Sequence, residues 1–344
     1  MKIKLVAAGL FLLSLLSPLK TAAANTDPEK IYIFGDSLSD AGNLYNATKF
    51  QAPPSPPYFE GRFSNGKVWV EYLGERLGLK PVLFTNLQNS TPSDGINYAF
   101  GGAGSGLFNT LFDPKELLPG ALAQVNLFTE NQQADPNALY IVWAGGNDYL
   151  FGNVTDVKQP IANISAAIAL LAVSGAKNII VPNLPDLGKI PFTSRTENAS
   201  LLTALTKKHN QALAEALQKL SIIPGIKIIP LDIESLFNRV QAAPSEFGLN
   251  LTNVTDACLV GSLQDVVQGN FSVCPNPDNY LFWDGVHPTT VVHNVIAETA
   301  LSALDIEYVP KPWVTLKDWN LELLSSKSVR VDIAQIPEES GYKN

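Results

Sequence analysis

The sequence predicts an α/β fold in which a parallel β-sheet lies between two layers of helices. Short, almost continuously apolar segments alternate along the chain with segments of helical periodicity, which is the pattern of successive β-α-β units. Polar or glycine-containing turns follow these apolar segments, as expected where buried parallel strands end. We count five such strands, so a flavodoxin-like strand order is expected.

The expected strands are rich in β-branched and aromatic residues, which suit the interior of a parallel sheet. They cover 31–34, 95–100, 138–144, 178–182 and 226–231. The expected helices cover 68–77, 118–130, 160–173, 198–220, 233–240 and 288–304. Pro160 and Pro288 each stand at a first helical turn, where the missing N–H is tolerated. The prolines of 53–57 exclude a helix or a central strand there.

The first residues resemble a secretory signal peptide. Lys2 and Lys4 precede an apolar run over 5–16, and small residues follow at 21–24. We expect cleavage near Ala24, which makes 1–24 the signal peptide; anchoring by an uncleaved signal is the alternative. No later stretch is apolar for long enough to span a bilayer, so we expect a secreted or periplasmic (extracellular) protein without a transmembrane span in the mature chain.

One domain is expected over 25–304, because no repeat or long linker divides it, and 305–344 form a tail without an assigned role. Removing residues 1–24 removes three lysines and no acidic residue, which changes the net charge from −8 to −11. An acidic surface argues against binding nucleic acid through charge. We expect a monomer.

The chain has two cysteines, Cys258 and Cys274, within a long irregular insertion expected at about 242–282. Two cysteines fit an exported protein with one disulfide. Free thiols or half of a metal site are the alternatives, and no histidine nearby supports the latter. We therefore expect a disulfide that braces the insertion.

Polar groups fall just beyond the ends of three expected strands, at Ser37, at the Gly101-Gly102 pair and at Asn147. In a doubly wound sheet the carboxyl ends of the strands line one crevice, where ligands bind. Taken alone, Asp36-Ser37 reads as a turn or helix cap. A nucleophilic serine would also need a base, because a free hydroxyl is hardly ionised at neutral pH.

Three histidines are available as that base. His209 lies in a long helix, where we expect a partly exposed surface or packing residue, and His293 lies in the last helix, packed or solvated. His287 stands in a loop, three residues after Asp284. This spacing allows the carboxylate to accept a hydrogen bond from one ring nitrogen and leaves the other as base. A loop cap or a metal pair is the alternative for this Asp-x-x-His pattern.

An oxyanion hole requires donors aimed at developing negative charge. The candidates are the Ser37 N–H, the Gly102 N–H and the side-chain amide of Asn147. For Asn147 a simple turn is the alternative, since asparagine tolerates left-handed geometry.

Four sequence blocks resemble those of the GDSL lipases and esterases of the SGNH hydrolase superfamily: 35–38 (Gly-Asp-Ser-Leu), 97–101, 145–148 (Gly-Gly-Asn-Asp) and 284–288 (Asp-Gly-Val-His-Pro). Residues 56–69 also resemble the segment after the nucleophile in larger members, which include plant GDSL lipases and bacterial secreted phospholipase/lecithinase/hemolysin-type proteins. The resemblance covers about 30–304 and implies the three-layer SGNH hydrolase fold.

The resemblance also implies roles for individual residues. Ser37 is the expected nucleophile, His287 the base and Asp284 the residue that orients it. The expected oxyanion donors are Ser37, Gly102 and Asn147; Gly101 or Gly102 is a choice of alignment, and we favour Gly102.

The expected function is therefore a secreted serine ester hydrolase, cleaving lipid or small acyl esters through an acyl-enzyme on Ser37 without metal or cofactor. An acyltransferase or a carbohydrate O-acetylesterase would use the same residues, whereas a non-catalytic binding protein would be expected to lack one of them. Five apolar loop residues are candidates for an acyl pocket or for ordinary packing: Phe59, Phe63, Leu107, Phe108 and Leu111.

Overall fold

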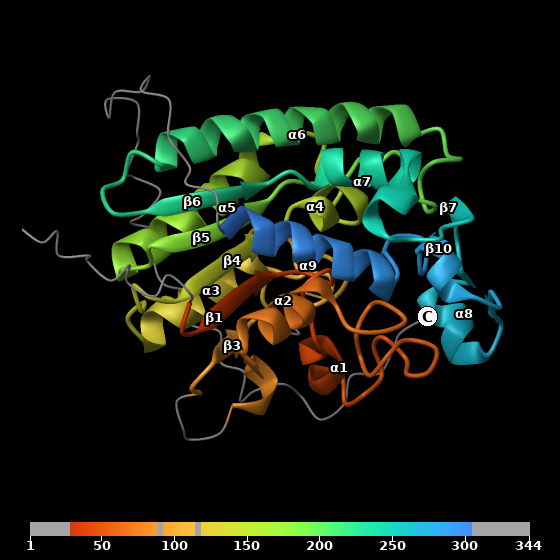
Figure 1. Ribbon diagram of the computed structural model, residues 1–344, viewed down its shortest axis with the longest axis horizontal. Helices are drawn as coiled ribbons and strands as arrows, with labels where there is room; N and C mark the ends of the chain where they lie inside the picture. The colour runs from red at the N-terminus through yellow and green to blue at the C-terminus, as the bar shows by residue number, and fades with distance from the viewer. Residues whose placement is uncertain (1–27, 88–91, 114–117, 305–344) are drawn as a thin grey trace, which may run out of the picture.

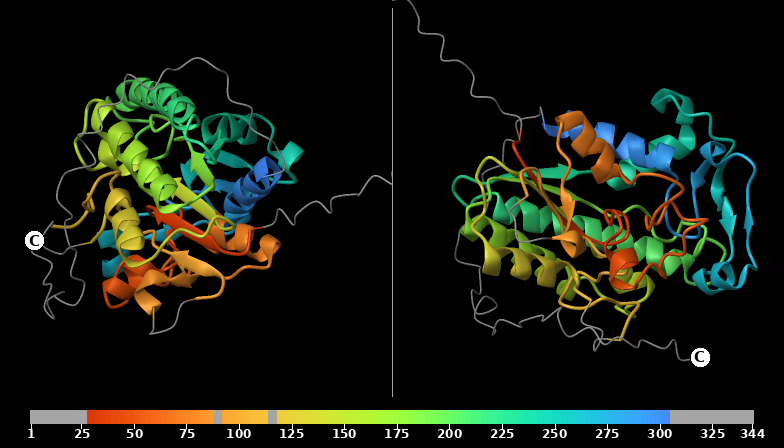
Figure 2. Two further views of the ribbon diagram at one scale, coloured as in Figure 1. Left: turned by 90° about the vertical axis from the view of Figure 1, so that its left-hand side faces the viewer. Right: turned by 90° about the horizontal axis from the view of Figure 1, so that it is seen from below.

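A computed structural model describes residues 28–87, 92–113 and 118–304 (Figure 1). The expected signal peptide at 1–24 and the expected tail at 305–344 lie outside the described residues. Within the described residues, the chain forms a central sheet with helices on both faces (Figure 2, left). The predicted α/β fold is confirmed.

The central sheet has six strands in the order β2-β3-β1-β4-β5-β6, and every pair of neighbours is parallel. The strands are β1 (Ile31–Gly35), β2 (Val82–Leu83), β3 (Gly95–Asn97), β4 (Leu139–Trp143), β5 (Asn178–Pro182) and β6 (Lys227–Leu231). The five predicted strands have the flavodoxin-like order. The count of five missed β2, because an edge strand of two residues carries too little periodicity to be recognised.

Side chains alternate between the two faces of the sheet, as the period of two in a strand requires. On β1 and β4, Ile31, Ile33 and Ile141 belong to one buried cluster, and Tyr32 and Tyr140 to the other. Both faces are therefore apolar, which is why these strands read as unbroken hydrophobic runs.

Each buried cluster is completed by its own set of helices. α2 (Trp69–Leu77), α7 (Ile233–Ala242) and α9 (Thr290–Leu304) cover the first face. α3 (Ala121–Asn131), α5 (Lys158–Ser174) and α6 (Ala199–Leu220) cover the second. All six correspond to helices predicted from the sequence, with ends that differ by a few residues.

Two short helices lie at loops that the sequence patterns left without a helix. α1 (Asn43–Ala47) and α4 (Gly146–Leu150) begin close after β1 and β4, each preceded by a glycine with positive φ. Asn147 is thus in the first turn of a helix. With five residues each, they are too short to show a helical period.

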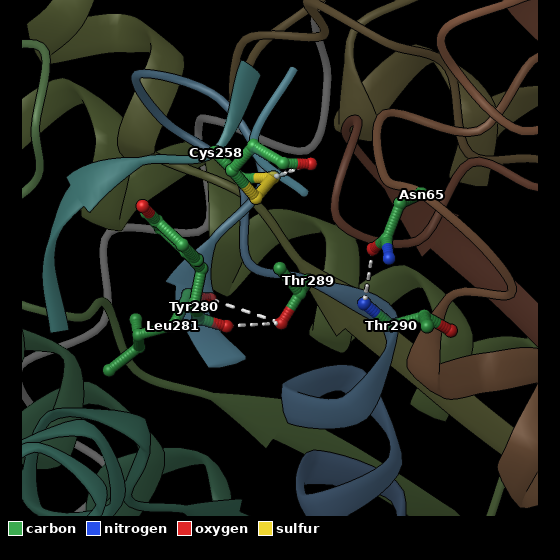
Figure 3. The surroundings of a disulfide bond; sticks show 7 residues. Asn65, Cys258, Tyr280, Leu281, Thr289 and Thr290 are labelled. Atoms are coloured by element: carbon green, nitrogen blue, oxygen red, sulfur yellow. Dashed lines mark hydrogen bonds between the residues drawn. A yellow bond between two sulfur atoms is a disulfide. The ribbon is translucent and has the colours of Figure 1, made fainter. Parts of the chain in front are cut away.

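The insertion, which was expected to be irregular, contains four short strands and a short helix. They are β7 (Asn253–Ala257), β8 (Leu259–Val260), α8 (Leu263–Gln268), β9 (Ser272–Val273) and β10 (Tyr280–Phe282). β10 pairs with β7, and β8 pairs with β9. The predicted Cys258–Cys274 disulfide is present (Figure 3). Main-chain hydrogen bonds from Cys258 to Phe282 and from Leu259 to Trp283 attach this disulfide-braced insertion to the segment before Asp284.

None of the helices in the described part of the chain is both long enough and apolar enough to cross a lipid bilayer.

Candidate active site

Ser37 lies just beyond β1, next to the place where the strand order of the sheet reverses. β3 is the neighbour of β1 on one side and β4 on the other, so the loops after β1 and β4 leave the sheet in opposite directions. Ser37 follows the first of these strands and Asn147 the second. The crevice of this fold therefore lies between the two residues.

Asp36 shapes the turn that carries Ser37. Its carboxylate accepts a hydrogen bond from the Leu38 N–H at 3.1 Å, and its carbonyl accepts from the N–H groups of Ser39 and Asp40. The side chain is buried, and burial raises the pKa of Asp36 to about 7.

Asp40 connects this turn to the glycine-rich loop after β3. One carboxylate oxygen accepts from Gly42 and Asn43, and the other accepts from Leu44 and from the N–H of Gly101 at 2.8 Å. Because the Gly101 N–H is occupied in this way, the next donor along the loop is that of Gly102. The sequence patterns did not indicate this role of Asp40, because its partner Gly101 lies 61 residues further along the chain.

Ser37, His287 and Asp284 are joined by hydrogen bonds although 250 residues separate the first two in sequence. His287 Nε2 lies 2.8 Å from Ser37 Oγ. On the other side of the ring, Nδ1 lies 2.8 and 2.9 Å from the two oxygens of Asp284. All three side chains are buried, between 6 and 8 % exposed. This is the arrangement of a nucleophile, a base and an orienting carboxylate.

Asp284 is held by its own loop as well as by His287. Its Oδ1 accepts from the N–H groups of Val286 and His287, at 2.8 and 2.7 Å. Burial acts to raise the pKa of Asp284, but the charge of His287 and these hydrogen bonds outweigh it, so the pKa lies below its usual value. Asp284 is therefore an anion beside the imidazole.

The two other candidate oxyanion donors come from the loops after β3 and β4. Gly102 has φ of +76°, which favours glycine, and among the described residues its N–H and that of Ser37 have no acceptor. The Asn147 side chain donates one hydrogen to the carbonyl of Ala103 at 3.0 Å. Its amide nitrogen carries a second hydrogen, and the residue lines the same cavity as Ser37.

An apolar cavity adjoins Ser37. Asp36, Ser37 and Asn147 contribute its polar wall. The rest is mainly apolar and comes from α4, from the loop after β5, from α7 and from the Asp284–Pro288 loop; it includes Leu150, Leu184, Leu187, Ile190, Phe237 and Val286. None of the five apolar residues considered for an acyl pocket from the sequence lines it. One of them, Phe63, packs instead on the His287 ring, 5.0 Å between centroids.

The two remaining histidines are core residues. His209 is fully buried, contrary to the expected partial exposure, and its Nδ1 lies 2.7 Å from the Tyr149 hydroxyl. His293 accepts a hydrogen bond from the Trp69 N–H. Burial lowers the pKa of His209 to about 4 and that of His293 to about 3, so both are neutral.

Between residues 28 and 304, apart from the two short gaps, no three His, Cys, Asp or Glu side chains lie together as ligands. The polar groups around Ser37 instead suit acyl transfer, because they pair a nucleophile and base with clustered hydrogen-bond donors.

Comparison with known proteins identifies the family of this chain. The profile of the GDSL-like lipase/acylhydrolase family matches residues 31–300. A phosphatidylcholine-sterol acyltransferase of Aeromonas hydrophila is 30 % identical over 335 residues, covering 84 % of this chain and 95 % of that protein.

This chain covers two further relatives to different extents. A GDSL esterase/lipase of Arabidopsis thaliana is 29 % identical, covering 86 % of this chain and 95 % of its own. A thermolabile hemolysin of Vibrio parahaemolyticus is 29 % identical over 80 % of this chain, which spans only 63 % of that protein. With a family profile that matches most of its length, the chain belongs to the GDSL lipase/acylhydrolase family of carboxylic ester hydrolases.

Proposed function

We propose that this protein is a serine ester hydrolase that works through an acyl-enzyme on Ser37. One observation carries the proposal: the unbroken series of hydrogen bonds from Ser37 Oγ through His287 to Asp284. In the first step His287 Nε2 takes the hydroxyl proton as Ser37 Oγ attacks the ester carbonyl. Asp284 fixes the tautomer and stabilises the imidazolium that forms.

The negative charge that develops on the carbonyl oxygen needs donors that are already in place. We assign this role to the N–H groups of Ser37 and Gly102 and to the side-chain amide of Asn147. The use of the Gly101 N–H by Asp40 supports Gly102 as the donor. As the first tetrahedral intermediate collapses, the bond to the alcohol breaks and His287 gives its proton to the departing alcohol, which leaves the acyl-enzyme. In the second step His287 takes a proton from water as the water attacks the acyl carbonyl, and then returns that proton to Ser37 Oγ as the bond to the acid breaks.

The substrate class follows from the cavity beside Ser37. Its walls are mainly apolar, so it suits the acyl group of an ester rather than a sugar or a charged head group. We propose carboxylic esters with an apolar acyl group as substrates; lipid esters are included, and a carbohydrate O-acetylesterase is less well supported.

The Ser37→Ala variant tests the mechanism. It removes the attacking oxygen, so hydrolysis of p-nitrophenyl esters should fall by at least 10³-fold, and labelling by a fluorophosphonate probe should disappear. Ser302→Ala is the matched control, because Ser302 lies exposed on α9 and donates only to the Glu298 carbonyl. Full activity of Ser37→Ala would refute the proposal, and a binding protein of this fold would fail to label.

Transfer to an alcohol is the second candidate function. The Aeromonas relative is named as an acyltransferase, and an acyl-enzyme can react with either water or an alcohol. Product analysis with a competing alcohol separates the two: free acid alone identifies a hydrolase, whereas a dominant new ester identifies a transferase.

We also propose that the protein is exported and acts outside the cytoplasm as a monomer, with residues 1–24 removed and 25–304 as the catalytic domain. The charged and apolar pattern of the N-terminal residues and the Cys258–Cys274 disulfide support export. N-terminal sequencing of protein recovered from the culture medium or periplasm tests this, with a first residue near Asn25 as the expected result.

A further inference from the structure

Tyr58 contacts the proposed catalytic site from a distant part of the sequence. Its hydroxyl donates to Asp284 Oδ2 at 2.8 Å, across 226 residues of chain. The side chain is only 3 % exposed. Burial and the adjacent carboxylate raise the pKa of Tyr58, so the phenol stays protonated and remains a donor.

The two oxygens of Asp284 differ in what holds them. The His287 ring contacts both oxygens, but Oδ1 is also held by backbone N–H groups of its own loop, those of Val286 and His287. Oδ2 accepts only from the His287 ring and from Tyr58 among the described residues. Among the described residues, Tyr58 is thus the one hydrogen-bond donor to this carboxylate from outside the Asp284–His287 loop, and it acts on the oxygen that the backbone N–H groups leave free.

Tyr58 is itself held firmly. Its ring meets the rings of Phe63 and Trp283 edge to face, with centroids 5.9 and 6.3 Å apart. Phe63 in turn packs on His287. Phe63 therefore lies between the Tyr58 phenol and the ring of the proposed base, and contacts both.

The rest of this segment is anchored to the same loop. The Ser64 hydroxyl donates to the Pro288 carbonyl at 2.9 Å. The Thr290 N–H donates to Asn65 Oδ1 at 2.9 Å, as Figure 3 shows. Residues 58–65 thus lie along 283–290 and are joined to it by contacts at both ends.

We propose that Tyr58 is a positioning residue: its hydroxyl holds the Asp284 carboxylate in the orientation that keeps His287 against Ser37. This inference rests on the proposed function. The hydrogen bond matters most as His287 becomes an imidazolium in the transition state, because a rotated carboxylate would stabilise that cation less well. Its loss should therefore lower kcat and leave KM nearly unchanged.

Tyr58→Phe removes the hydroxyl and keeps the ring packing. Hydrogen bonds to charged groups are strong, so we expect kcat to fall on the order of tenfold, with KM within about twofold of the wild-type value. Tyr140→Phe is the matched control, because that hydroxyl donates to the Asp135 carbonyl in the loop before β4, at the opposite edge of the parallel sheet from Ser37, which follows the carboxyl end of β1. It should keep the wild-type kcat.

A double-mutant cycle with Asp284→Asn separates positioning from a general structural effect. If Tyr58 acts through the carboxylate, Tyr58→Phe should cost little further in the Asp284→Asn background. The rate of fluorophosphonate labelling is the readout, because this single-turnover reaction remains measurable in slow variants. Melting temperatures of all four proteins verify that each is folded.

The outcomes distinguish this inference from the proposed function. If Ser37→Ala is inactive while Tyr58→Phe keeps kcat within twofold, the triad assignment stands and the role of Tyr58 is overturned. An equal loss from Tyr58→Phe in both backgrounds also overturns it, since the residue would then act independently of Asp284. An active Ser37→Ala variant would refute the proposed function, and this inference with it.

Discussion

The pH dependence of the free energy of unfolding tests the environment of Asp36, which lies in the turn that carries Ser37. The side chain is 4 % exposed and accepts one backbone hydrogen bond, from Leu38. Burial raises its pKa from 3.8 to about 7, although that hydrogen bond and the charge of His287 act in the opposite direction. Folding therefore favours the neutral carboxyl. The contribution of this group to stability is present below about pH 4 and is lost as the pH rises through 7.

The magnitude follows from the two pKa values. Each pKa unit corresponds to about 1.4 kcal/mol, so the rise from 3.8 to about 7 amounts to about 4 kcal/mol of unfolding free energy between pH 4 and pH 8. Asp36→Asn removes this titration and keeps an oxygen that can accept from Leu38. The free energy of unfolding of the variant minus that of the wild type should therefore increase by about 4 kcal/mol over this range.

Urea unfolding followed by tryptophan fluorescence at pH 4, 6 and 8 measures this difference. Asp40 and Asp148 are also buried carboxyls with raised pKa values. Both titrate in both proteins, so their contributions largely cancel in the comparison, apart from the smaller effect of the Asp148 charge on Asp36. A difference that stays constant with pH, or that falls, would refute the reasoning. Since Asp36 shapes the turn and does not contact the His287 ring nitrogens, Asp36→Asn should also cost far less activity than Ser37→Ala or His287→Ala.

Two further variants test the cavity and the disulfide. Leu150 is half-buried and forms part of the cavity wall. Leu150→Ala should therefore shift the preference among p-nitrophenyl esters toward longer acyl chains, and Leu150→Trp toward shorter ones, with Leu201→Ala at an exposed position as the control. Identical chain-length profiles would exclude the cavity as the acyl site. Replacing Cys258 and Cys274 by serine removes a cross-link between residues 16 apart and should lower the free energy of unfolding by about 3 kcal/mol in a chemical denaturation experiment, whereas an unchanged midpoint would contradict the expected bracing.

The order of the sheet and the main helices could be predicted from the sequence because they depend on local patterns. A run such as Ile31–Gly35 is apolar on both faces, which distinguishes a buried parallel strand from an exposed one. α4 and the strands of the insertion were not predictable in this way. They are too short to show a period, and their stability depends on contacts with distant residues.

The residues of the proposed site divide along the same line. Ser37, Asn147 and His287 were recognisable because each stands in a short block of distinctive residues, and Asp284 because it is close to His287 in sequence. Tyr58, Asp40 and the cavity walls were not, because their partners are far away in the chain. Only the folded structure brings the Tyr58 hydroxyl to Asp284 and places residues of α4, α7 and the loop after β5 around the cavity beside Ser37.

By itself, then, the sequence determined the fold class, the disulfide and the residues proposed for acyl transfer, since each of these is encoded in composition or in short spacings. The tertiary structure decided which groups surround them: a phenol beside the orienting carboxylate, a buried carboxylate linking Ser37's turn to Gly101, and an apolar cavity next to the serine. These depend on the relative placement of segments more than 50 residues apart, which local sequence patterns do not specify.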